Sequence, residues 1–150
     1  MFPPDTIFFY AQTDAFSEFS NFAPYGVALD DLWWPTAEHY FQAQKFESEK
    51  YRDRIRRASR PKDAKALGMT RALPLRADWE DVKDGLMHRV VGAKFRTHPA
   101  LADLLLATGD RMIVENAPMD AYWGCGPDGL GQNKLGRILM QVRSEIRHGA

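Results

Sequence analysis

The C-terminal segment has the clearest hydrophobic periodicity in the chain. Apolar side chains recur there at i, i+3, i+4, i+7 and i+11, in the order Leu135, Ile138, Leu139, Val142 and Ile146. This spacing places the five side chains on one face of an α-helix, which is typical of a surface helix packed on a core. The pattern predicts a helix over about 133–147.

Two residues that commonly cap helices, Thr36 and Asp78, precede other helical segments. They predict helices over about 36–46 and 78–95. Proline and glycine positions predict further helices over about 50–58, 61–68 and 99–109. The helix that follows Asp78 has an apolar stripe, which consists of Val82, Leu86, Val90 and Ala93.

Strands are fewer and shorter than helices. Apolar runs predict them over about 7–10, 27–33 and 112–115, and the second run is bounded by Gly26 and Pro35. Because helices dominate, the sequence predicts an α+β fold. The chain has 150 residues without a Pro/Ser-rich linker or a repeat, so we expect one domain over residues 1–150.

The overall composition excludes several classes of protein. Hydrophobic residues make up 45% of the chain and charged residues 27%, as in soluble globular proteins. A net charge of zero gives no general argument for binding to nucleic acid or membranes. The single cysteine, Cys125, and the lack of a secretory leader pattern predict a cytoplasmic protein. The four histidines lack zinc-type spacing, so we expect no metal and no other cofactor.

A glycine-rich segment, WGCGPDGLGQN, precedes the last predicted helix. It contains G-x-G-x-x-G at Gly124, Gly126 and Gly129, but the residues before it make a poor strand and Pro127 interrupts it. A dinucleotide site is therefore disfavoured. Either the glycines form tight turns, or they let backbone N–H groups approach a phosphate or sugar at a helix N-terminus.

A polar stripe follows the helix predicted after Thr36. Glu38, Gln42 and Lys45 are spaced at i, i+4 and i+7 and so share a face. The stripe is either a solvated face or a pocket wall that presents a carboxylate, an amide and an amine to one ligand. Glu38 lies in the first turn, where the helix dipole favours its ionised form, as suits a base, a nucleophile or a partner for sugar hydroxyls.

Three other features have both a structural and a functional interpretation. Asp120 lies in a turn-prone segment and is either a turn residue or a catalytic group. Trp79 is either a core anchor or a platform on which a base stacks. The segment from Lys50 to Arg71 contains nine basic residues and two acidic ones. This excess indicates either a solvated helix face or a set of arginine side chains that bind phosphate through paired hydrogen bonds.

Three segments resemble, in order, the motifs of the YbiA-like family, also called the NADAR domain: FSEFSNFAP, WPTAEHYFQAQKF and DAYWGCGPDGLGQNKLGRILMQVR. The resemblance extends from about Ile7 to Arg143 and implies a compact, helix-rich α+β fold. It also implies an N-glycosidase. Some members hydrolyse the N-ribosyl bond of phosphorylated aminouracil intermediates of riboflavin synthesis. Others resemble hydrolases that remove ADP-ribose from guanine in nucleic acid.

The resemblance implies that Glu38, Asp120 and Trp79 are functional and that Lys45 forms a Schiff base in one branch. We expect Glu38 to bind the ribose hydroxyls and stabilise positive charge at C1, Asp120 to activate water or assist proton transfer, and Trp79 to stack on the base. The catalytic prediction is Glu38, Asp120 and Lys45. The substrate-binding prediction is Trp79, Trp123, Asn21, Gln42 and Asn133.

The expected partner is a phosphorylated N-ribosyl small molecule or an ADP-ribosylated nucleobase. If the partner is an ADP-ribosylated nucleobase, we expect transient contact with nucleic acid. We expect neither a membrane nor an obligate protein partner. A third alternative is a non-catalytic module that binds ADP-ribose or nucleotides.

The covalent route through Lys45 can be tested by chemical trapping. If its amine attacks C1 of the ring-opened sugar, borohydride added with substrate will reduce the Schiff base and fix the sugar on Lys45. Mass spectrometry of peptides then finds the adduct. An enzyme that is active but never trapped would contradict this route.

Overall fold

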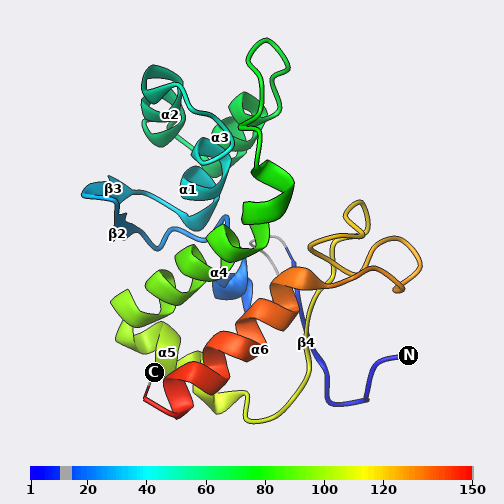
Figure 1. The fold of residues 1–150 in the computed structure, drawn as a ribbon. Helices are drawn as coiled ribbons and strands as arrows, with labels where there is room; N and C mark the ends of the chain where they lie inside the picture. Colours follow the sequence, from blue (N-terminus) through cyan, green and yellow to red (C-terminus); the bar gives the residue numbers. More distant parts are fainter. Residues whose placement is uncertain (11–14, 150) are drawn as a thin grey trace.

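The computed structural model describes residues 1–10 and 15–149 (Figure 1). Within these ranges the chain forms six α-helices and four short strands, which confirms the expected α+β fold. The elements are β1 (Ile7–Phe9), the 3-10 helix η1 (Ser17–Phe19), β2 (Val27–Leu29), β3 (Leu32–Trp34), α1 (Ala37–Ala43), α2 (Glu49–Arg56), α3 (Pro61–Gly68), α4 (Trp79–Thr97), α5 (Pro99–Ala107), β4 (Ile113–Glu115) and α6 (Lys134–Arg147).

The strands form two separate pairs. β1 pairs in parallel with β4, so that Phe9 is opposite Glu115, and β2 pairs with β3 in antiparallel register. The prediction of one strand over 27–33 is therefore wrong. The chain reverses at Asp30 and Asp31, which have φ angles of 57° and 62°. Aspartate tolerates this left-handed conformation, which tight hairpin turns require at both central positions.

Helix α4 connects the two halves of the molecule. In Figure 1 it crosses the centre, and it contacts α1 and β2 as well as α5 and α6. Because these neighbours cover several sides of α4, its buried residues extend beyond the apolar stripe expected from the sequence. Within that stripe, only Val90 is fully buried. No helix in residues 1–10 and 15–149 combines the length and apolar character needed to cross a bilayer.

The helix caps agree only in part with the sequence. The Thr36 side chain accepts a hydrogen bond from the backbone N–H of His39, as expected of an N-cap. Asp78 occupies the N-cap position of α4 but makes no side-chain cap bond. Its carboxylate instead pairs with the guanidinium of Arg76, at 2.6 Å from Nε. In α6, the predicted apolar face is buried except at Ile146, which is partly buried.

A buried lysine fixes the loop that precedes β2. The Lys94 ammonium of α4 donates to the backbone carbonyls of Glu18 and Ser20, at 2.6 and 2.8 Å. The next carbonyl in this loop, that of Asn21, accepts the backbone N–H of Glu38 at 3.1 Å. The loop thereby connects α4 to the first turn of α1.

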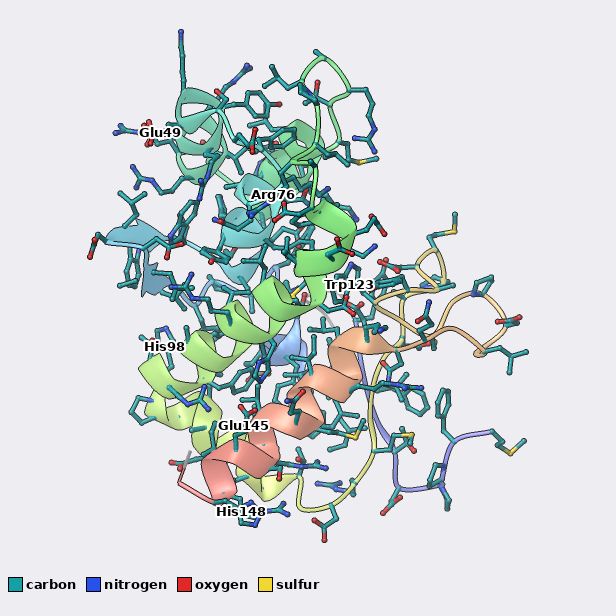
Figure 2. All side chains as sticks on the ribbon, in the orientation of Figure 1. Glu49, Arg76, His98, Trp123, Glu145 and His148 are labelled. Carbon is teal, nitrogen blue, oxygen red and sulfur yellow. The ribbon has the colours of Figure 1, made fainter. Side chains whose placement is uncertain are left out.

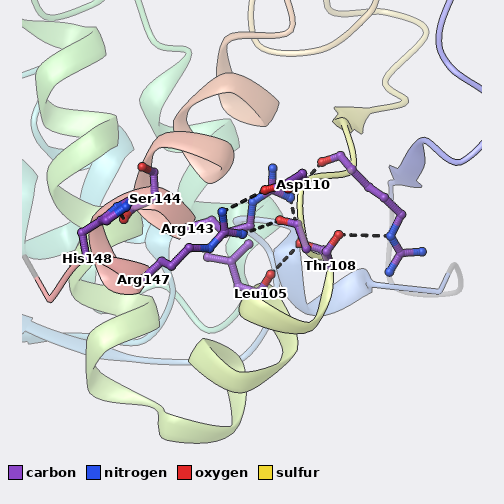
Figure 3. Close-up of polar contacts among 9 residues, drawn as sticks. Leu105, Thr108, Asp110, Arg143, Ser144, Arg147 and His148 are labelled. Atoms are coloured by element: carbon purple, nitrogen blue, oxygen red, sulfur yellow. Dashed lines mark hydrogen bonds and ion pairs between the residues drawn. The ribbon is translucent and has the colours of Figure 1, made fainter.

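A buried arginine fixes the turn that leads into β4 (Figure 3). Arg143 of α6 donates to the Thr108 hydroxyl and to the carbonyl of Arg111, both at 2.8 Å. One turn further along α6, Arg147 pairs with Asp110 at 2.8 Å. Strand β4 therefore begins from a turn that is held firmly against α6.

Candidate active site

Helix α1 carries its polar residues in the protein interior. All seven of its residues are buried, and Glu38 and Gln42 are only 7% and 5% exposed. The solvated-face interpretation of the stripe is therefore wrong. The Gln42 amide donates to a carboxylate oxygen of Glu38 at 2.7 Å. Lys45 follows the helix, is partly buried, and directs its ammonium to the carbonyl of Gly68 at 3.4 Å.

Burial decides the electrostatics of Glu38. Loss of hydration raises the pKa of this carboxyl, and the nearby Asp120 carboxylate raises it further. The hydrogen bond from Gln42 and the positive charges of Lys65 and Lys45 act in the opposite direction, but burial is the largest effect. The helix dipole was expected to favour the ionised form, and burial outweighs it.

Asp120 is a turn residue, and its catalytic role stays a prediction. One of its carboxylate oxygens accepts the backbone N–H groups of Tyr122 and Trp123, at 2.9 and 2.8 Å, which forms a tight turn. Its charge also acts on Glu38 across the fold. The structure thus brings together two carboxylates that come from distant parts of the sequence.

A third carboxyl group in this cluster, Glu115, was missed by the sequence analysis. It is the last residue of β4 and is mostly buried. Burial, together with the carboxylates of Asp120 and Glu38, raises the pKa of Glu115 to about 7. The signal was present, because an acidic residue at the end of a buried strand is unusual, and it precedes Asp120 by five positions.

An aromatic wall lies beside the carboxyl groups. Trp79 is 6% exposed and packs on Phe41, with ring centroids 5.1 Å apart. Phe41 also contacts Trp123 edge to face, at 5.3 Å. Figure 2 shows Trp123 next to the N-terminal part of α4. Phe41 therefore joins the two tryptophans that the sequence analysis selected, and Trp123 remains partly exposed.

Lys45 has the electrostatic character that a nucleophilic amine needs. Partial burial lowers the pKa of its ammonium group, and the positive charges of Arg71 and Lys65 lower it further. The Glu38 carboxylate acts in the opposite direction.

Two buried side-chain oxygens near Glu38 have no partner among the described residues. They are Oε1 of Gln42 and Oδ1 of Asn21. The amide nitrogen of Asn21 contacts the sulfur of Met87 at 3.3 Å, and Asn21 is 8% exposed. Buried acceptors of this kind are costly unless a donor reaches them. Both are therefore suited to accept hydrogen bonds from a ligand's hydroxyl or N–H groups.

The model of the NADAR domain family matches residues 8–147, which is almost the whole chain. The protein belongs to the NADAR family. It is 49% identical to N-glycosidase YbiA of Escherichia coli over 143 residues, which are 95% of this chain and 89% of that protein. The NMR structure of E. coli YbiA superposes with a TM-score of 0.89 at 48% identity, covering 97% of this chain and 87% of the other.

Two other relatives have different names. N-glycosidase Npun_R5314 of Nostoc punctiforme is 45% identical to this NADAR protein, and the match covers 94% of the Nostoc protein. The chloroplastic riboflavin biosynthesis protein PYRR of Zea mays is 43% identical over 155 residues. Here the match covers 93% of this chain but only 25% of the maize protein.

In the glycine loop of this NADAR protein, backbone N–H groups donate to carbonyls of the same part of the chain. The N–H groups of residues 131 to 135 all donate to carbonyls of residues 121 to 125. Gly126 and Gly129 have φ angles of 72° and 77°, which permit the turns. These bonds favour the tight-turn interpretation, because the amides at the start of α6 have partners within the loop.

Asn133 fastens the same loop to β4. Its side-chain oxygen accepts the N–H of Glu115 at 3.0 Å, and its side-chain nitrogen donates to the carbonyl of Ile113 at 2.9 Å. Gly136 permits this contact, since a Cβ there would lie 2.2 Å from that carbonyl. Asn133 therefore positions Glu115, and its direct contact with substrate stays a prediction.

Most of the basic stretch lies away from the carboxyl groups. Asp53 pairs with Arg56 and Arg57, and Asp63 pairs with Arg60. Lys65 differs, because its charge acts on both Glu38 and Glu115. Two surface hollows of about 550 and 490 Å³ border α1 and α2, and neither is lined by Glu38, Glu115 or Asp120. Within the described ranges, no three His, Cys, Asp or Glu residues could hold a metal ion.

The bond between Gln42 and Glu38 depends on the absence of a side chain at Gly68. A Cβ there would lie 2.0 Å from Oε1 of Gln42 and 3.0 Å from its Cβ, so the amide would have to move. We expect Gly68→Ala to lower kcat/KM by about 10–100-fold, the equivalent of one hydrogen bond to a charged group.

Gly85→Ala is the matched control, because Gly85 lies within α4 and a Cβ there meets no atom within 4 Å. It is expected to keep full activity and to gain about 0.5–1 kcal/mol of stability. Steady-state kinetics and thermal unfolding of both variants provide the readout. Equal activity of the two variants would refute the role of Gly68.

Proposed function

We propose that this NADAR protein hydrolyses the N-ribosyl bond of phosphorylated aminouracil intermediates of riboflavin biosynthesis. Its general class, a hydrolase of N-glycosyl bonds, is the class named by its relatives at 49% and 45% identity. Riboflavin biosynthesis appears in the names of the maize relative and of VVA0006 from Vibrio vulnificus. The observation that carries the proposal is the pairing of Glu38 and Asp120 beside an aromatic wall.

Cleavage of an N-ribosyl bond develops positive charge at C1 of the ribose. Glu38 is fixed by Gln42, so its carboxylate is held in place while this charge forms. A cation next to Glu38 also favours its ionised form, against the effect of burial. Asp120, on the facing loop, accepts a proton from water as that water attacks C1.

The surrounding groups match the rest of such a substrate. The unpartnered oxygens of Asn21 and Gln42 accept hydrogen bonds from the ribose hydroxyls. Trp79 and Trp123 flank the flat base. Lys65 supplies positive charge for the phosphate on the side of α3.

A variant of this mechanism uses Lys45 as the nucleophile. The lowered pKa of its ammonium group supports attack by the free amine on the ring-opened sugar. The two routes share the same substrate. The borohydride experiment described above separates them.

A second candidate function, removal of ADP-ribose from guanine in nucleic acid, is favoured by the charge of the basic stretch. Asp53 and Asp63 pair there with Arg56, Arg57 and Arg60. These two aspartates leave an excess of seven positive charges between Lys50 and Arg71, which suits a long polyanion.

The proposal is tested by offering the purified protein both types of substrate. Mass spectrometry measures the products. We expect it to detect release of the free aminouracil base and of ribose phosphate. Release of ADP-ribose from modified guanine without release of the aminouracil would overturn the proposed substrate. Binding without any turnover would favour the non-catalytic module.

Conservative variants test the two carboxylates. Glu38→Gln and Asp120→Asn should each lower kcat by at least about 10²-fold, while Glu38→Gln still binds substrate by calorimetry. Asparagine retains the oxygen that accepts the N–H groups of Tyr122 and Trp123, so the loop is preserved.

Asp128→Asn is the control for Asp120→Asn. Asp128 lies in the same loop and its carboxylate accepts the N–H of Leu130 in a similar turn, at 2.9 Å. It should retain full activity. Loss of activity in Asp128→Asn to the same extent would mean that the loop, and not the charge of Asp120, limits turnover.

A further inference from the structure

Glu115 is held more rigidly than its position at the end of a short strand suggests. Its backbone N–H donates to Asn133 at 3.0 Å, and its carbonyl accepts the N–H of Cys125 at 2.9 Å. On the other side it lies in parallel register with Phe9. Two separate segments, the glycine loop and β1, therefore fix the starting point of its side chain.

The carboxyl group itself is not engaged by the protein. Among the described residues, the hydrogen bonds of Glu115 all involve its backbone. Glu38, in contrast, is bound by Gln42, and Asp120 accepts two backbone N–H groups. Of the three clustered carboxyl groups, Glu115 is thus the one whose two oxygens are both free of protein hydrogen bonds among the described residues, whereas Glu38 and Asp120 each use one oxygen.

The surroundings of Glu115 favour the protonated acid. Asp120 faces it from the glycine loop and Glu38 from α1, and both negative charges oppose its ionisation, while Lys65 of α3 acts in the opposite direction. With burial as the largest effect, the pKa is raised to about 7. A carboxylic acid that is buried beside other carboxyl groups gives up its proton less readily than one in water.

The reaction under "Proposed function" needs a proton at a second place. When the bond between C1 and nitrogen breaks, the electron pair goes to the nitrogen of the base, which is a poor leaving group unless it is protonated. Glu38 and Asp120 have roles at the sugar and at the water. No acid has yet been assigned to the base.

We propose that Glu115 is the general acid that protonates the leaving nitrogen. This assignment rests on the proposed N-ribosyl hydrolase function. The C1–N bond breaks, the Glu115 carboxyl transfers its proton to that nitrogen, and water forms the new C1–O bond. The proton lost by water passes to Asp120 and from there to Glu115, which restores the protonated acid, so the products are the neutral base and ribose phosphate.

Glu115→Gln tests this role by comparing two leaving groups. With the aminouracil substrate we expect kcat/KM to fall by about 10²–10⁴-fold. With para-nitrophenyl riboside phosphate, whose leaving group departs without a proton, the loss should be less than about 10-fold. Equal losses on both substrates would show a structural role and overturn the proposal.

The pH profile gives a second readout. Activity of the unsubstituted enzyme on the aminouracil should decline as the pH rises through about 7, where Glu115 loses its proton. Glu115→Gln should lack this decline. Glu49→Gln is the control on the outer surface of α2 (Figure 2), and it should match the unsubstituted enzyme with both substrates.

A measurement without substrate separates the two proposals. NMR of the side-chain carboxyl carbons, assigned by difference from Glu115→Gln, follows the ionisation of Glu115 directly. Titration near pH 7 supports the assignment even if the aminouracil proves to be the wrong substrate. Full ionisation of Glu115 well below pH 7 would overturn the role as acid while leaving the proposed function intact.

Discussion

Helix α1 buries a carboxylic acid within seven residues that have almost no contact with water. A buried carboxyl group must find partners inside the protein or keep its proton, and Glu38 has one hydrogen bond from Gln42 and only distant cations. Every neighbouring element is arranged around this constraint. The loop at Asn21 holds the first turn of α1, and Gly68 of α3 leaves room for the Gln42 amide.

The same constraint explains why the three carboxyl groups behave differently. Each negative charge added to a poorly hydrated cluster makes the next one harder to form. Asp120 takes two backbone N–H groups as partners, which suit an ionised oxygen. Glu115 has neither such donors nor an arginine, and its pKa is the one raised to about 7. Carboxyl groups of similar chemistry thus differ in hydrogen bonding and in how readily they ionise because their surroundings differ.

The sequence predicted the helices well, because caps and periodicity are local signals. Pro61 and Gly68 bound α3, and Thr36 caps α1, as expected. The hairpin at Asp30 was missed, since two aspartates are a weaker turn signal than Asn-Gly.

The candidate site could be predicted only in part. Glu38 and Asp120 were selected by their motifs, and the structure brings their charges together. Glu115 was missed because its surroundings come from α1, α3 and the glycine loop, and no local pattern encodes that meeting. Nor did local signals indicate that Asn133 would bond to the backbone of β4.

The parallel pairing of β1 with β4 has a consequence for how the protein is made. Ile7 is added to the chain about 100 residues before its partner Ile113. At about 5–20 residues per second, β1 waits roughly 5–20 s for that partner. During this interval the ring of Phe9, fully enclosed in the finished protein, has no strand beside it. Until β4 has been made, the apolar side chains of β1 therefore lack the strand that pairs with them in the folded protein.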